Sequence, residues 1–146
     1  MRFDIILPDS KPKGFISDAI AEYRKRLSRF CDLRLFYRSA NGRQAGRTGH
    51  GSGSCVNVLV ASGAEGANDF TSEEFAGWIQ ARLNRSAGGF AFWIPGEGEN
   101  PKDFGAAWDE VIRLTYIETE WDLAALILTE QIYRAFMINS GSAYHK

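Results

Sequence analysis

The chain has 146 residues, of which 45% are apolar and 24% are charged, and its formal net charge is -1. These values are typical of a globular protein with one hydrophobic core, so we expect a single domain over residues 1–146. No apolar run approaches the roughly 20 residues of a membrane-spanning helix, and the first residues lack the apolar stretch of a signal peptide. We therefore expect a cytoplasmic protein without a membrane partner.

The cysteines and histidines do not form a pattern that binds metal. Cys31 and Cys55 are far apart and lack a CxxC spacing, and His50 and His145 are too few for a zinc site. We expect reduced, structural thiols and no metal. The sequence also has no Walker loop and no Ser-His-Asp spacing.

Charge is distributed unevenly along the chain. Residues 1–50 contain eleven Lys or Arg and five Asp or Glu, whereas residues 51–146 contain six and thirteen. A basic N-terminal third can meet a nucleic-acid phosphate backbone, but the same residues also suit solvated helix and loop faces.

The N-terminal part predicts a strand, an amphipathic helix and a second strand. Arg2 to Leu7 is a strand-like run that Pro8 ends, and Leu33 to Arg38 is a second one. Between them, from Phe15 onward, apolar residues recur at helical spacing, and basic residues occupy the other faces. The apolar positions are Ile16, Ile20, Tyr23, Leu27 and Phe30.

Residues 39–54 differ in composition from the rest of the chain. Five glycines alternate here with Arg43, Arg47 and His50, and the segment offers little for a core. We predict a flexible loop. It is either a basic arm that folds on RNA or a disordered linker.

The middle of the chain predicts strand, helix, strand. Cys55 to Ala61 is almost continuously apolar, as in a strand buried on both faces of a parallel sheet. Thr71 and Glu74 have capping-box spacing and Phe70 precedes Phe75 as in a hydrophobic staple, so a helix should begin here. Phe90 to Ile94 predicts the next strand.

Three further elements are predicted in the C-terminal part. Asn100 can cap a helix that begins at Pro101 and has Phe104, Trp108 and Ile112 on one face. Arg113 to Ile117 alternates like a fifth strand, and Trp121 to Met137 is the last helix. Apolar residues surround that helix almost completely between Leu123 and Leu128, which favours burial or an oligomer interface.

Strands that alternate with helices predict an α/β fold with a mostly parallel sheet. Ligands of such folds bind at the carboxyl ends of the strands. The loops at 62–69, 95–100 and 118–121 are therefore the candidate ligand-binding segments.

The last seventeen residues carry the most specific pattern. They read EQIYRAFMINSGSAYHK: a helix end with Glu130 and Arg134 four residues apart, a break at Asn139 to Gly141, and a terminal Tyr-His-Lys. This ending closely resembles that of the ribosomal RNA large subunit methyltransferase H family of the SPOUT superfamily. EYRKRL at 22–27 and SEEFA at 72–76 are similar to the same family.

The resemblance implies a homodimeric enzyme with a C-terminal trefoil knot, which transfers a methyl group from S-adenosyl-L-methionine to 23S ribosomal RNA. By analogy the acceptor is N3 of a pseudouridine in the assembled ribosome. The residues expected to line the cofactor are Ile94, Gly96, Gly98, Leu114, Thr115 and Ile117. Those expected to be catalytic are His145, Tyr144 and Arg134, and Lys146, Arg24 and Arg26 are expected to bind the substrate.

The cofactor loops depart from the family pattern. The typical Ile-Gly-Gly-x-x-Gly reads Ile94-Pro95-Gly96-Glu97-Gly98-Glu99, a typical Pro-His is Glu120-Trp121, and the basic residue four positions later is Ala125. An alternative is therefore a non-catalytic SPOUT-fold dimer that binds RNA or the ribosome and has lost the cofactor.

Overall fold

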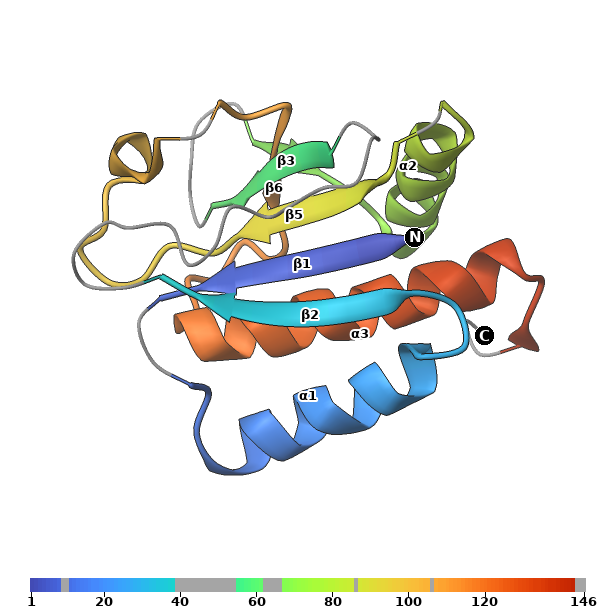
Figure 1. Ribbon diagram of the computed structural model, residues 1–146, viewed down its shortest axis with the longest axis horizontal. Coiled ribbons are helices and arrows are strands. Elements are labelled where there is room, and N and C mark those ends of the chain that lie inside the picture. Colours follow the sequence, from blue (N-terminus) through green and yellow to red (C-terminus); the bar gives the residue numbers. More distant parts are fainter. Residues whose placement is uncertain (9–10, 39–54, 62–66, 86, 106, 144–146) are drawn as a thin grey trace.

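A parallel sheet is the centre of the fold. The computed structural model describes residues 1–8, 11–38, 55–61, 67–85, 87–105 and 107–143. In these residues six strands run in the order β2-β1-β5-β3-β6-β4, and every neighbouring pair is parallel (Figure 1). The strands are β1 (Arg2–Leu7), β2 (Asp32–Tyr37), β3 (Cys55–Val60), β4 (Asn68–Asp69), β5 (Gly89–Trp93) and β6 (Glu110–Arg113). The predicted α/β class with a parallel sheet is confirmed.

Three helices pack against one face of the sheet and form the main core. They are α1 (Gly14–Leu27), α2 (Ser72–Asn84) and α3 (Trp121–Asn139). Figure 1 shows α1 and α3 side by side along the sheet, and α3 contacts both other helices. Stacked aromatic rings fill the centre, with the Phe3 and Phe90 ring centroids 5.1 Å apart. Burying each such side chain contributes about 1.5–3 kcal/mol.

The opposite face of the sheet carries a smaller apolar cluster. Ile6, Leu59, Ala91 and Trp93 form its buried part. Phe104 packs against them from a short 3-10 helix, η1 (Pro101–Phe104). This helix therefore covers the strand ends that lead into the segment after β5.

The predicted start of α2 is confirmed in detail. The Glu74 amide donates to the Thr71 hydroxyl over 3.1 Å, and the Thr71 amide donates to the Glu74 carboxylate over 2.7 Å. The rings of Phe70 and Phe75 lie 6.1 Å apart, as a staple requires. The last helix, α3, ends at Asn139, two residues after the predicted Met137, and Gly141 in the predicted break has a left-handed φ of 73°.

The predictions for residues 101–117 are partly wrong. The helix that begins at Pro101 lasts only one 3-10 turn, since Gly105 takes a left-handed φ of 68°. Ile112 is not on a helix but in β6, where it pairs with Val60 and is buried. The predicted strand at 113–117 thus lies three residues earlier, at Glu110–Arg113, and Leu114 to Ile117 form a loop.

Other expectations stay predictions or fall outside the described residues. The knot and the single-domain organisation stay predictions. The predicted flexible loop at 39–54 lies outside the described residues, as does most of the 62–69 loop, whose end forms the unpredicted strand β4. No helix in the described ranges is long and apolar enough to cross a membrane.

Candidate functional site

A cavity of about 770 Å³ lies at the carboxyl ends of β3, β5 and β6. Its walls are the end of β3, the segments that follow β5 and β6, and the first turn of α3. All six residues predicted to line a cofactor line this one cavity: Ile94, Gly96, Gly98, Leu114, Thr115 and Ile117. The volume is within the range of roughly 300–1,000 Å³ for small-molecule sites.

The segment after β5 makes a tight turn at the cavity. The Glu99 amide donates to the Gly96 carbonyl over 3.2 Å, and Gly98 inside the turn has a φ of 72°. The Gly96 amide donates to Glu99 Oε1 over 2.8 Å. This amide is therefore already bonded to the protein, so Gly96 contributes close packing rather than a free donor.

Arg38 lies beneath this turn and is buried. Its guanidinium forms an ion pair of 2.7 Å with Glu99 and lies 4.2 Å from the centroid of the Phe104 ring. Burial by itself raises the pKa of Glu99, but hydrogen bonds from Arg38 and the Gly96 amide, with the charge of Arg38, bring that pKa below its ordinary value of 4.5. Glu99 is therefore ionised at neutral pH.

The segment after β6 is held from the edge of the sheet. Arg113 makes two hydrogen bonds of 2.7 Å with Asp69, whose carboxylate also accepts the Tyr116 hydroxyl over 3.1 Å. The Ile117 amide donates to the Thr115 hydroxyl over 3.0 Å. These contacts fix the backbone of Leu114 to Ile117 beside the cavity.

The described lining residues include four glutamates and no lysine or arginine. They are Glu97, Glu99, Glu118 and Glu120. Arg38 neutralises Glu99 from outside the cavity, so the lining favours a ligand that carries positive charge.

The two residues of α3 that differ from the family pattern, Trp121 and Ala125, have different surroundings. Trp121 lines the cavity beside Glu120. Ala125, one turn further along the helix, is fully buried in the core. A basic side chain at residue 125 would lose its hydration in these surroundings.

Of the residues predicted for catalysis and substrate binding, the structure describes Arg134, Arg24 and Arg26, and none of these three lines the cavity. Arg134 pairs with Glu130 over 2.8 Å near the end of α3, which confirms the predicted helical ion pair. Tyr144, His145 and Lys146 lie outside the described residues.

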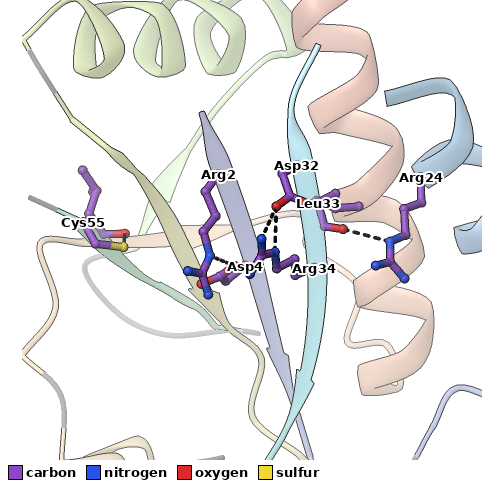
Figure 2. Close-up of polar contacts among 8 residues, drawn as sticks. Arg2, Asp4, Arg24, Asp32, Leu33, Arg34 and Cys55 are labelled. Carbon is purple, nitrogen blue, oxygen red and sulfur yellow. Dashed lines mark hydrogen bonds and ion pairs between the residues drawn. The ribbon is translucent and has the colours of Figure 1, made fainter. Parts of the chain in front are cut away.

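Arg24 and Arg26 lie on α1. Figure 2 shows the Arg24 side chain directed at the carbonyl of Leu33, to which its Nε donates over 2.8 Å. Arg24 lines a second, open cavity of about 530 Å³, and Arg26 pairs with Glu22 at the surface. Neither arginine lines the first cavity.

The cysteines behave as structural thiols. Burial, the largest cause, raises the pKa of Cys31 to about 12 and that of Cys55 to about 11. Both thiols are therefore protonated at neutral pH, which argues against nucleophilic roles.

Comparison with known proteins identifies the family. The family model described as predicted SPOUT methyltransferase matches residues 1–145. The chain belongs to this SPOUT methyltransferase family. The SPOUT match covers the cavity, both cavity loops and α3.

Curated relatives are similar over their whole length. The chain is 32% identical to ribosomal RNA large subunit methyltransferase H 1 of Thermoanaerobacter sp. (strain X514). It is 31% identical to ribosomal RNA large subunit methyltransferase H of Lactobacillus helveticus and 30% identical to that of Leuconostoc mesenteroides. Each alignment covers 100% of both chains.

Sequence reasoning missed two supports of the SPOUT cavity, Arg38 and the Asp69–Arg113 pair. Arg38 follows β2 directly, and the carboxyl end of a parallel strand is where ligand-site residues gather. The position of Arg38 at the end of a predicted strand could therefore have marked it as a candidate site residue. Its partner Glu99 is 61 residues away in sequence, and no local pattern joins them.

Proposed function

We propose that this SPOUT-family chain is an S-adenosyl-L-methionine-dependent methyltransferase that acts on 23S ribosomal RNA, at N3 of a pseudouridine in the assembled ribosome. The observation that carries the proposal is the cavity at the carboxyl ends of three parallel strands, lined by all six residues predicted for the cofactor. The names of the relatives support ribosomal RNA as the substrate class.

The lining suits this cofactor in size, polarity and charge. The cavity holds apolar surface from Leu59, Ile94 and Leu114, together with backbone groups of the two loops. When bound, S-adenosyl-L-methionine supplies an electrophilic methyl group on a positively charged sulfur. The carboxylates of Glu97, Glu118 and Glu120 favour that positive charge.

The remaining chemistry is the removal of a proton. Uracil-type N3 carries a proton that leaves as the N–CH3 bond forms and the S–CH3 bond breaks, and a base must accept it. We assign this step to His145, with Tyr144 as a proton relay or a stacking surface for the base. Arg134 and Lys146 would stabilise negative charge on the base carbonyls or hold phosphate.

The chain would act as a homodimer in the cytoplasm. Neighbouring apolar side chains on α3 support a protein partner, because Leu123 is 37% exposed and Trp121, Ala124, Leu126 and Ile127 are half-buried. On the substrate side, Arg24, Arg26 and the other basic residues of the N-terminal third would meet the RNA backbone.

Calorimetry with S-adenosyl-L-methionine separates the enzyme from the alternative, a non-catalytic dimer that has lost the cofactor. We expect saturable binding with one site per chain, because the cavity is preformed and its lining is acidic. The control ligand is S-adenosylhomocysteine, whose sulfur is uncharged, and it should bind more weakly. No heat of binding at millimolar cofactor would contradict the enzyme and favour the alternative.

The C-terminal tail provides a second test of the same proposal. His145→Ala, and separately a chain that ends at residue 143, should lose methylation of ribosomal RNA by about 100-fold or more, the usual size of a lost general base. Cofactor affinity should stay unchanged, since both variants keep all the described residues that line the cavity. Full activity of the shortened chain would show that the proton acceptor lies elsewhere.

A further inference from the structure

The ion pair between Arg38 and Glu99 joins the end of β2 to the cavity turn. Arg38 Nη2 lies 2.7 Å from Glu99 Oε1, and Arg38 is only 9% exposed. The Glu99 side chain is 34% exposed, so solvent partly screens the pair, but the charge-assisted hydrogen bond has a defined geometry. It therefore constrains the position of the Glu99 side chain.

Arg38 is itself fixed by the strand ends around it. Nη1 donates to the carbonyl of Ile6 over 3.0 Å, and Nη2 also donates to the carbonyl of Ile94 over 2.9 Å. The ring of Phe104 lies against the guanidinium. The arginine thus bridges the ends of β1 and β5, and its charged group has one orientation.

Glu99 transmits this constraint to the turn. The oxygen that pairs with Arg38 also accepts the amide of Gly96. A Cβ atom at Gly96 would lie 2.7 Å from that same oxygen and 2.9 Å from Cγ of Pro8, so only glycine fits without a shift. The turn from Gly96 to Glu99 is therefore held closely on the side away from the cavity.

We propose that Arg38 and Glu99 are positioning residues that hold the Gly96–Glu99 turn in the shape that accepts S-adenosyl-L-methionine. The inference rests on the proposed function. It adds how this chain, in which Pro95 and Glu99 depart from the family pattern, keeps the loop in a shape that can bind the cofactor. A turn that is already ordered in the free protein loses little conformational entropy when the ligand binds. A preformed turn therefore strengthens affinity. In this arrangement Glu99 holds the turn that forms one wall of the cavity, whereas Glu97, Glu118 and Glu120 contribute negative charge.

The test is cofactor calorimetry on Glu99→Ala and Glu99→Gln beside the wild-type chain. We expect the dissociation constant to rise about tenfold or more in Glu99→Ala, because the turn must then be ordered on binding. Glu99→Gln should retain part of the affinity, since an amide oxygen can still accept from Gly96 and Arg38. Amide hydrogen exchange at Gly96 should be faster in the cofactor-free Glu99→Ala chain than in wild type.

A double-mutant cycle shows whether the two residues act together. Glu99→Gln, Arg38→Gln and the double variant should give affinities in which the second change adds little to the first. If Arg38→Gln does not fold, the two Glu99 variants alone decide. Asp32→Ala is the matched control, because it removes the half-exposed pair with Arg34 at the opposite end of β2 (Figure 2).

The possible failures are distinguishable. Wild-type affinity in Glu99→Ala, or an equal loss in Asp32→Ala, would overturn the positioning role and leave the methyltransferase proposal intact. Absence of cofactor binding by the wild-type chain would overturn both.

Discussion

Glu99 is a carboxylate whose two partners use one oxygen. Arg38 and the amide of Gly96 both donate to Oε1, and together they lower the pKa of Glu99 even though burial acts in the opposite direction. Deprotonated Glu99 is thus stabilised by the folded chain. The same contacts must therefore make folding depend on pH.

The stabilisation by Glu99 should be lost in acid. Since the pKa is lower in the folded chain than in the unfolded one, the contribution is complete above the ordinary value of 4.5 and disappears as pH falls through the lowered folded value. Urea unfolding of wild type and Glu99→Gln, from neutral pH to acid, should show a difference in unfolding free energy that shrinks below that value. A difference that grows as pH falls would contradict this sign.

Single residues of the site were predictable where they belong to a local motif. Gly96 and Gly98 could be placed at the cavity because they follow a predicted buried strand and allow close backbone approach. The role of Glu99 could not, because it depends on Arg38, which reaches the turn only through the order of strands in the sheet.

Helices and strands were predictable where their signals are local. The start of α2 depends on Thr71 and Glu74, three residues apart, and these pair as the sequence indicates. The region after Pro101 depends instead on Gly105, which ends the helical turn, and on pairing of Ile112 with Val60 across the sheet. Apolar spacing alone assigns Ile112 to a helix face as readily as to a strand.

The capping box of α2 gives a test for that element. Thr71→Ala removes the hydroxyl that accepts the Glu74 amide and should lower the unfolding free energy by about 1 kcal/mol. Thr71→Ser retains the hydroxyl and is the control. Chemical denaturation of the three chains checks the prediction, and equal stability of the alanine and serine variants would contradict it.

For the molecule as a whole, the α/β fold class was predictable from the sequence, but the order of strands in the sheet was not. Alternating strands and helices indicate a parallel sheet, and the structure has one. The strand order places β5 between β1 and β3, although β5 follows both in sequence, and no local signal encodes such a crossover. The substrate side was predicted mainly from the C-terminal residues, of which 144–146 lie outside the described part of the chain.

The length of α3 limits which cavity the tail can serve. Its first turn, at Trp121 and Ala124, lines the cavity, and its 19 residues extend about 28 Å at 1.5 Å per residue. At the far end the Ser142 amide donates to the carbonyl of Met137, and the four residues that follow Ser142 span at most about 14 Å. The described end of the chain, at Ser142, thus lies most of the length of α3 away from the cavity of its own chain. Under the proposed function, a proton acceptor in the tail would act at the cavity of a neighbouring copy, and each complete reaction centre would be shared between two chains.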